Sequence, residues 1–121
     1  MVAAVIMRGG RYLVCRRPPE KRHGGLWEFP GGKVADGETR TQAVRRELAE
    51  ELSLDTVDVG AVVYVSADDG SPYVIEFLET VAEGVPVLHE HSEIGWFTRS
   101  ELAALPLAPA DALFAASLPR D

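Results

Sequence analysis

The order of apolar and polar residues predicts two β-hairpins. Residues 2–7 form a continuous apolar run typical of a central strand, and two glycines after Arg8 would turn the chain into a second strand at residues 12–16. Residues 57–65 and 72–81 are two further apolar stretches, separated by an Asp-Gly pair that favours a tight turn between antiparallel strands. Both pairs are therefore expected to be antiparallel.

The clearest helical pattern lies in residues 40–52. Thr39 and Gln42 have the spacing of a capping box, so we expect the helix to begin near Arg40. Apolar residues recur in it at intervals of four and form one stripe that would pack on the core: Val44, Leu48 and Leu52. This packing would leave the neighbouring side chains along the edge of a cleft.

Two shorter helices are expected near the C-terminus. Thr98 or Ser100 can cap a helix that runs through Leu105. Two prolines in residues 106–111 interrupt it, and residues 112–118 would form a final amphipathic helix.

Three acids lie side by side on the helix of residues 40–52. At 100° per residue, Glu50 falls about 60° to one side of Glu47, and Glu51 falls about 40° to the other. Because Glu47 and Glu51 are like charges four residues apart, they cost an isolated helix about 0.2–0.5 kcal/mol. A hard divalent cation such as Mg²⁺ would turn this repulsion into coordination. On these residues alone, the alternative is a solvated acidic helix face.

The composition narrows the class of protein. The 121 residues suffice for one domain with a single core, and 46% hydrophobic and 26% charged residues are ordinary for a globular protein. The formal net charge of -7 argues against wrapping duplex nucleic acid, which needs clustered Lys and Arg. An anionic substrate would therefore have to be neutralised locally, by a metal ion and a few arginines.

The N-terminus and the single cysteine bear on location. Cys15 excludes an internal disulfide and suits a reducing compartment, and without a supporting pattern for a nucleophile it is interpreted as a small core residue. The apolar run before Arg8 is too short for a signal peptide or a membrane span. We therefore expect a cytoplasmic protein that does not contact membranes.

Two other segments are interpreted as containing no metal. Asp68 and Asp69 could suggest Ca²⁺, but no twelve-residue loop of oxygen ligands follows, so a plain turn is expected. His89 and His91 could suggest Zn²⁺, yet they would need further His or Cys ligands, and His23 is the only other histidine.

The spacing around the helix acids is specific. Gly32, five residues, Glu38, seven residues, and then Arg46-Glu47-Leu48-x-Glu50-Glu51-x-x-Leu54 resemble the signature of the Nudix hydrolases, which cleave a nucleoside diphosphate linked to another group. The similarity to the MutT-like branch extends to LWEFPGG at residues 26–32 and PLAPAD at residues 106–111. Ser53 departs from the pattern, because the family usually has Gly there, where helices commonly end at positive φ.

The resemblance implies an architecture. We expect one Nudix domain over residues 1–121, of the α/β class, with a mixed curved β-sheet sandwiched between helices. The acidic helix would cover one face of the sheet, and the C-terminal helix would cover the other.

The resemblance also implies a metal ion and its ligands. The ion would be Mg²⁺, with Mn²⁺ as an alternative ion, held by Glu50, Glu51 and the Gly31 carbonyl, for which Gly32 is the near alternative. A fourth carboxylate is expected about six residues before the Trp that begins the last strand, where Glu90 stands and Glu93 competes.

The same resemblance assigns roles to the remaining acids of the motif. Glu47 is favoured as the base that takes a proton from the attacking water, although base and ligand can exchange roles among such acids. Catalytic work is therefore expected from Glu47, Glu50 and Glu51, each of them also a candidate ligand. Arg46 lies on the flank of the acidic stripe nearest Glu50, so Glu38 and Arg46 are interpreted as a structural ion pair that fixes the loop to the helix.

Three substrate contacts follow from the MutT-like resemblance. Arg17 would contact phosphates, although it and Arg16 could be surface charges. Phe29 would line the nucleobase pocket, unless it fills the core. Asp111 would accept hydrogen bonds from an exocyclic amine or a protonated ring nitrogen of the base, with helix N-cap as the alternative.

The expected activity is hydrolysis of nucleoside triphosphates to NMP and pyrophosphate. The expected substrates are oxidised or noncanonical (d)NTPs such as 8-oxo-dGTP, or cytidine nucleotides. One alternative is a Nudix hydrolase acting on ADP-ribose or dinucleoside polyphosphates, and another is a nucleotide-binding regulator without turnover. The partner would be a small-molecule nucleotide, and the protein a monomer or homodimer.

Overall fold

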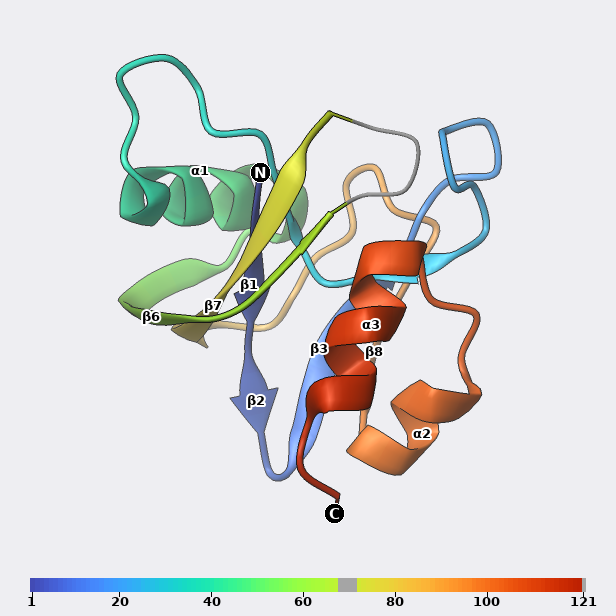
Figure 1. The fold of residues 1–121 in the computed structure, drawn as a ribbon. Coiled ribbons are helices and arrows are strands. Elements are labelled where there is room, and N and C mark those ends of the chain that lie inside the picture. Colours follow the sequence, from blue (N-terminus) through green and yellow to red (C-terminus); the bar gives the residue numbers. More distant parts are fainter. Residues whose placement is uncertain (68–71, 121) are drawn as a thin grey trace.

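The strands are divided between two sheets (Figure 1). A computed structural model describes residues 1–67 and 72–120, and in this part of the chain each sheet has four strands. The first sheet has the order β5 (Gly31–Gly32), β1 (Val2–Val5), β7 (Val74–Glu83) and β6 (Asp55–Ala67). The second has the order β2 (Met7–Arg8), β3 (Arg11–Arg16) and β4 (Trp27–Glu28), with β8 (Glu93–Phe97) also paired to β3. The helices are α1 (Arg40–Leu52), α2 (Arg99–Ala104) and α3 (Pro109–Ser117).

Strand β1 lies between two hydrophobic cores. Successive side chains of a strand point to opposite faces, so Val2 and Ala4 enter one core and Ala3 and Val5 enter the other. The first core contains the buried stripe of α1, as predicted: Val44, Leu48 and Leu52. The second contains the aromatic cluster of Phe29, Phe77 and Phe114. Helices α1 and α3 therefore cover opposite sides of β1 and β7 (Figure 1), which confirms the expected α/β class.

The first sheet is mixed, and the N-terminal apolar run contributes to both sheets. Strand β1 pairs parallel to β7 and antiparallel to β5, whereas β2 pairs antiparallel to β3. The run therefore changes sheets at Ile6, which is buried. Gly9 and Gly10 have φ of 56° and 76°, the positive values that a two-residue hairpin turn needs, so the first predicted hairpin is confirmed.

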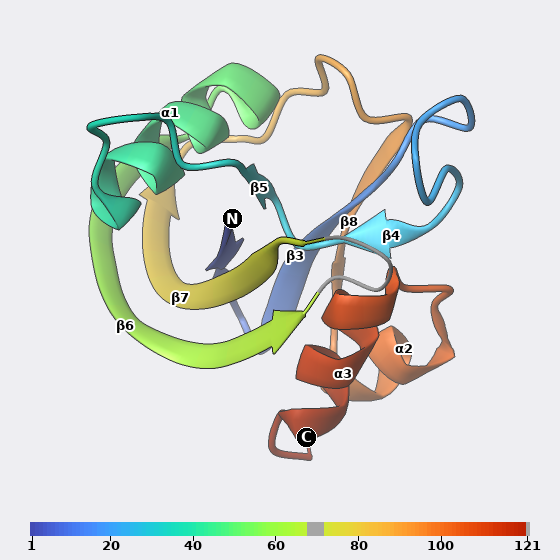
Figure 2. The same ribbon diagram turned by 45° about the horizontal axis from the view of Figure 1, so that its top comes forward.

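The second predicted hairpin is formed by β6 and β7, which pair antiparallel. Register shifts along the pair mark β-bulges, and both strands curve strongly (Figure 2). Strand β6 is longer than the predicted residues 57–65. The expected turn at Asp68 and Asp69 lies outside the described residues.

The helix starts follow their caps. Thr39 and Gln42 form the predicted capping box of α1, and Thr98, rather than Ser100, caps α2. The final helix starts at Pro109, three residues before the prediction, because proline is favourable in a first helical turn. Ala108 is the N-cap residue, and Asp111 lies in the first turn of α3. The N-cap interpretation of Asp111 was therefore wrong.

Cys15 is fully buried in the first core, as predicted. Strand β8 begins at Glu93, so Trp96 lies within the last strand and does not begin it. In the described residues, no helix has the length and apolar character needed to cross a membrane.

Candidate active site

Arg46 organises the acids at the start of the motif. Its guanidinium binds Glu38 through two bonds, Nε to Oε2 at 2.8 Å and Nη2 to Oε1 at 3.0 Å, and Nη2 also donates to the Lys33 carbonyl at 2.9 Å. Hydrogen bonding to Arg46 lowers the pKa of Glu38 to about 2. The expected ion pair between Glu38 and Arg46 is therefore present, and it joins the loop before α1 to the helix.

Arg46 also contacts two of the helix acids. Its Nη1 donates to Glu47 Oε1 at 2.9 Å and to Glu50 Oε2 at 3.3 Å. Burial raises the pKa of Glu47 despite this contact. The Glu47 carboxylate lies against Gly32, where an added Cβ would stand 2.6 Å from Glu47 Cδ, so a larger residue there would displace the carboxylate from its present position. Glu50 is different, because 60% of its side chain is exposed.

Glu51 occupies the most unfavourable position for a carboxylate. Its Oε1 accepts a hydrogen bond from the Gly31 N–H at 3.1 Å, and within the described residues no Lys or Arg pairs with it. Burial first, and then the charges of Glu47 and Glu28, raise the pKa of Glu51 to about 8. Acidic groups are therefore concentrated around Glu51, and no basic side chain of the described residues pairs with the Glu51 carboxylate.

This donor set fits a divalent ion. The oxygen-only ligands that Mg²⁺ prefers are present, and a cation would relieve the repulsion around Glu51. In the part of the chain that the structure describes, no three His, Cys, Asp or Glu side chains already converge on one coordination point. Arg46 engages Glu47 and Glu50, so Glu50 would have to rotate, for which its exposure leaves room.

A second group of residues lies on the β4 side of Glu51. Arg17 Nη1 binds Glu28 Oε1 at 2.9 Å, and His91 Nε2 lies 2.8 Å from Glu28 Oε2. Glu28 was not predicted in any role from the sequence, and His91 was considered only as a zinc ligand. The pairing of β3 with β4 aligns Cys15 with Glu28, a register that the sequence did not reveal.

The two competitors for the fourth carboxylate lie in different surroundings. Glu90 is exposed, and its charge contributes to the raised pKa of Glu51. Glu93 instead binds Arg16 Nη1 at 2.7 Å across the β3–β8 ladder. Glu90 therefore has the position that suits a ligand better, and Arg16 is engaged as a surface ion pair.

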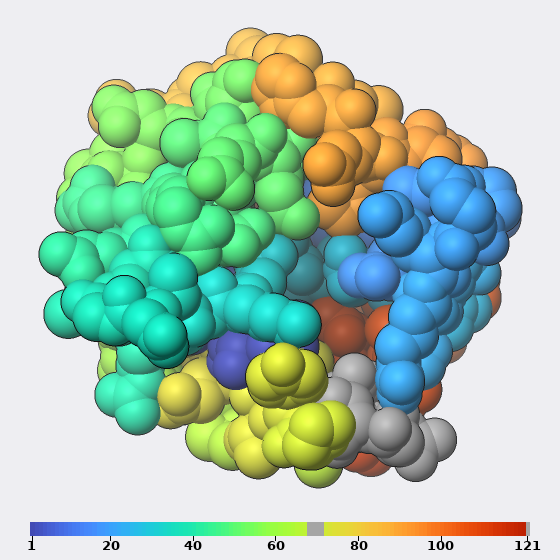
Figure 3. All heavy atoms as spheres, turned by 90° about the horizontal axis from the view of Figure 1, so that it is seen from above, coloured from blue at the N-terminus to red at the C-terminus, as the bar shows by residue number. Residues whose placement is uncertain are grey.

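A hollow connects Glu51 with Asp111. A cavity of about 170 Å³ is bordered by both residues, and a neighbouring cavity of about 380 Å³ shares Arg17, Glu28 and Asp111 with it. Figure 3 looks onto this face, where a depression lies between the green and teal residues of α1 and its preceding loop, the orange segment before β8 and the blue loop after β3.

Asp111 and Phe29 meet at the floor of the hollow. Asp111 is 4% exposed, and its Oδ2 accepts a hydrogen bond from the Phe29 N–H at 2.8 Å. The ring of Phe29 packs edge-on against Phe77 and Phe114, with centroids 5.9 and 5.1 Å apart. Phe29 is therefore a core residue that also borders the smaller cavity.

Two further residues of the hollow were missed from the sequence. Lys33 Nζ lies 4.8 Å from the ring centroid of Tyr73, and both residues line the larger cavity. The position of Lys33 directly after Gly31 and Gly32 was the only signal that could have indicated it.

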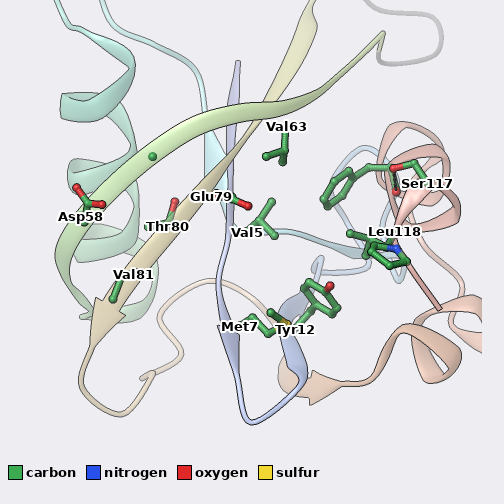
Figure 4. A pocket seen from close by; sticks show the side chains of 13 residues that line it. Val5, Met7, Tyr12, Asp58, Val63, Glu79, Thr80, Val81, Ser117 and Leu118 are labelled. Carbon is green, nitrogen blue, oxygen red and sulfur yellow. Dashed lines mark hydrogen bonds between the residues drawn. The ribbon is translucent and has the colours of Figure 1, made fainter. Parts of the chain in front are cut away.

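A larger cavity, of about 600 Å³, lies elsewhere (Figure 4). Its lining includes Val5, Met7, Val63 and Val81 and none of the predicted site residues. We therefore assign the chemistry to the hollow beside Glu51.

Comparisons with known proteins agree with this geometry. The family description "NUDIX domain" matches residues 1–118. CTP pyrophosphohydrolase of Escherichia coli (strain K12) is 39% identical over 114 residues, which are 92% of this chain and 84% of that protein. A Mycobacterium tuberculosis protein, provisionally named 8-oxo-dGTP diphosphatase 2, is 39% identical over 125 aligned positions, gaps included, which cover 99% of this chain and 87% of that protein.

Solved structures of similar proteins share the fold of this chain. The crystal structure of MutT NUDIX hydrolase from Burkholderia pseudomallei matches with a TM-score of 0.80 at 27% identity, covering 98% of this chain and 95% of that one. The expectations of a Nudix fold and of an enzyme acting on phosphoanhydride bonds are confirmed. Hydrolases of this kind generally use divalent metal ions. The chain belongs to the Nudix hydrolase family, in its MutT-like branch.

Proposed function

We propose that the protein is a Mg²⁺-dependent nucleoside triphosphate pyrophosphohydrolase, with Mn²⁺ as an alternative ion, that releases NMP and pyrophosphate. The observation that carries the proposal is Glu51, a partly buried carboxyl among other acids, beside a hollow that leads to Asp111. This arrangement is costly for a protein that binds no cation, because like charges in a buried site repel strongly.

The proposed ligands are Glu50, Glu51, the Gly31 carbonyl and Glu90. A bound divalent ion would neutralise charge on the diphosphate oxygens and lower the pKa of a coordinated water. Glu47 is the proposed base, because its raised pKa brings its proton affinity closer to neutral pH while Arg46 fixes one of its oxygens. Ligand and base can still exchange roles between Glu47 and its neighbours.

Arg17 is proposed to contact the substrate phosphates. It lines both cavities of the hollow, and Glu28 holds its guanidinium there through Nη1. A positive side chain fixed in this way can meet an anion on a molecule whose net charge is -7.

Asp111 is proposed to read the base. One of its oxygens binds the Phe29 backbone, and the buried carboxyl would accept hydrogen bonds from base N–H groups. Cytosine offers its exocyclic amine, and 8-oxoguanine offers an amine and an additional ring N–H. The names of the two relatives, a CTP pyrophosphohydrolase and a provisional 8-oxo-dGTP diphosphatase, support these two classes of substrate. Sanitation of the nucleotide pool in the cytoplasm is the proposed role, and the single buried cysteine suits that compartment.

Replacing Asp111 with Asn tests this assignment. Asn keeps the shape but presents donors beside the acceptor, so the ratio of kcat/KM between 8-oxo-dGTP and CTP should change about tenfold. An unchanged substrate profile, in protein with a normal melting temperature, would remove Asp111 as the base reader.

The alternative of a nucleotide-binding regulator without turnover depended on Ser53, and the structure weakens that support. Ser53 was its only hint, and the structure accommodates this residue at the end of α1 with φ of 54°. The helix acids are unaffected by it, because the α1 hydrogen bonds continue to Ser53 N–H, which donates to the Ala49 carbonyl.

The experiment incubates the protein and Mg²⁺ with 8-oxo-dGTP, CTP, the unmodified triphosphates, ADP-ribose or a dinucleoside polyphosphate, and measures both the nucleotide products and the pyrophosphate released. NMP and pyrophosphate from the triphosphates are expected. AMP from ADP-ribose alone would contradict the proposal in favour of the other kind of Nudix hydrolase, and no turnover at all would favour the regulator. The variant with both Glu50→Gln and Glu51→Gln is the negative control, and Glu83→Gln, an exposed acid at the end of β7, is the matched positive control.

A further inference from the structure

The loop that carries Glu90 is attached to the rest of the protein on both sides of this residue. His89, directly before it, contacts Ser53 after α1, and His91, directly after it, contacts Glu28 in β4. These two attachment points belong to different elements, and Glu90 lies between them in the chain, near enough to Glu51 for its charge to contribute to the raised pKa of that carboxyl. Glu90 therefore stands in the middle of a short segment that is attached at both ends.

The first attachment explains the unusual residue at the end of α1. Ser53 adopts the left-handed conformation that normally favours glycine, and its Oγ lies 2.7 Å from His89 Nε2. A glycine at this position would be less strained but would provide no hydroxyl. The neighbouring backbone bond from Val87 N–H to the Leu52 carbonyl, 2.8 Å long, ties the same loop to the same helix end.

The second attachment is buried. The His91 side chain is 5% exposed, and its Nε2 lies 2.8 Å from Glu28 Oε2, whose other oxygen binds Arg17. Ser92 N–H donates to the Arg16 carbonyl at 3.0 Å, which fixes the chain directly after His91. The segment is thus held at residues 87, 89, 91 and 92, while the carboxylate between the histidines stays exposed.

We propose that the Ser53–His89 and Glu28–His91 contacts are positioning contacts that hold Glu90 over Glu51 so that both carboxylates can bind one divalent ion. This inference rests on the proposed function, in which Glu90 is a ligand. The physical reason is ordering: a ligand on a free loop must lose conformational freedom when it binds, whereas a ligand on an attached loop has already lost it. The two histidines of the HEH segment thus act through the acid between them and not as zinc ligands.

The test measures Mn²⁺ affinity of the whole protein by electron paramagnetic resonance, without substrate. His89→Ala and Ser53→Ala should each weaken binding about three- to tenfold, and together no more than either alone, because both remove the same contact. His89→Gln, which retains a side-chain donor, should recover most of the affinity. Val85→Ala, at an 83% exposed position in the same loop, is the matched control and should bind like the wild type.

The buried contact between His91 and Glu28 is tested with two substitutions of His91 whose side chains are similar in size to each other. His91→Leu removes the bond to Glu28, and His91→Gln retains a donor, so only the first should weaken Mn²⁺ binding by about tenfold. Each variant is first checked for a wild-type circular dichroism spectrum, and the exposed pair of Ser53 and His89 decides the question if His91→Leu does not fold.

The deciding comparison repeats His89→Ala in a Glu90→Gln background. Because the histidine acts through Glu90, its removal should have no further effect on Mn²⁺ affinity there. An equal loss in both backgrounds, or wild-type affinity of His89→Ala, would overturn the inference. If nucleotide hydrolysis still requires Glu50 and Glu51 in that case, the proposed function stands without it; if the wild type binds no Mn²⁺, the proposed function itself fails.

Discussion

Two groups of acids around α1 differ in how their charge is balanced. In the Arg46 cluster, which consists of Arg46 with Glu38, Glu47 and Glu50, the guanidinium contacts all three carboxylates. In the Glu51 cluster, which consists of Glu51 with Glu28 and Glu90, the charges of the other two acids contribute to the raised pKa of Glu51. Among its described contacts, Glu51 receives a hydrogen bond only from the Gly31 backbone.

The difference appears in the pKa values. Hydrogen bonding to Arg46 lowers the pKa of Glu38 to about 2, whereas burial and neighbouring charges raise the pKa of Glu51 to about 8. The Arg46 cluster is complete by itself and connects loop to helix. The Glu51 cluster is incomplete without a cation. Arg46 pairs with the acids of the first cluster, whereas in the second cluster Arg17 pairs with Glu28 and no Lys or Arg of the described residues pairs with Glu51.

The largest expected effect comes from removing charge in the Glu51 cluster. Glu51→Gln should lower kcat/KM for the preferred triphosphate by at least about 10²-fold, because it removes a carboxylate that the proposed ion needs. The measurement is steady-state pyrophosphate release, with Glu83→Gln as the matched control. Undiminished turnover by Glu51→Gln would mean that the Glu51 cluster does not hold the ion that the reaction needs.

A smaller effect is expected in the Arg46 cluster. Arg46→Lys keeps the charge but cannot reproduce the two parallel bonds to Glu38, so the loop before α1 should loosen. We expect a lower melting temperature and a loss of about tenfold in kcat/KM. Thermal unfolding and kinetics on the same sample test this, and a loss as large as that of Glu51→Gln would mean that Arg46 itself takes part in the reaction.

The pH dependence of stability provides a third contrast. A carboxyl with a raised pKa in the folded state keeps its proton there after the unfolded chain has lost it, so stability falls as pH rises from about 4.5 to about 8. The measurement is made in the presence of a metal chelator. As pH rises through this window, the unfolding free energy of the wild type should fall, relative to the unfolding free energy of Glu51→Gln, by up to about 1.4 kcal/mol per pH unit.

Urea unfolding of both proteins below, within and above the window measures this difference. Glu51→Gln should become the more stable protein in the upper part of the window although it is the less active one. A constant difference across the window would show that Glu51 does not titrate abnormally.

The smallest effect is expected at the end of α1. Ser53→Gly relieves the left-handed conformation of a residue with a side chain, which should raise stability by about 1 kcal/mol. It also removes the contact with His89, so metal affinity should fall while the melting temperature rises. A rise in both would mean that the serine hydroxyl has no role beyond the helix end.

Local patterns made much of the fold predictable. The capping box of Thr39, the apolar stripe of α1 and the turn glycines act over a few residues, and all three were predicted correctly. The Glu38–Arg46 pair was also predictable, because a motif helix and its preceding loop are close in sequence. The start of α3 was predicted incorrectly although Pro109 carried the signal, since proline is favourable in a first helical turn and was interpreted only as an interruption.

The contrast between the two clusters was not predictable in the same way. The raised pKa of Glu51 comes first from burial, which depends on the whole fold, and then from the neighbouring charges of Glu47, Glu28 and Glu90. Glu28 and Glu90 arrive from β4 and from the loop before β8, far from α1 in sequence. Ser53 meets His89 across 36 residues of sequence, so its substitution for glycine could be noticed but not explained. Phe29 belongs to the core because of Phe77 and Phe114, which only the fold brings beside it.

In the proposed function, the Glu51 cluster binds a divalent cation in place of a proton. Calorimetric titration of Mg²⁺ into the metal-free protein, at a pH between 4.5 and 8 and in buffers of different ionisation enthalpy, measures the protons released on binding. The wild type should release about one proton per ion bound, and Glu51→Gln should release almost none. Tight binding to the wild type without proton release, or equal release by both proteins, would contradict it.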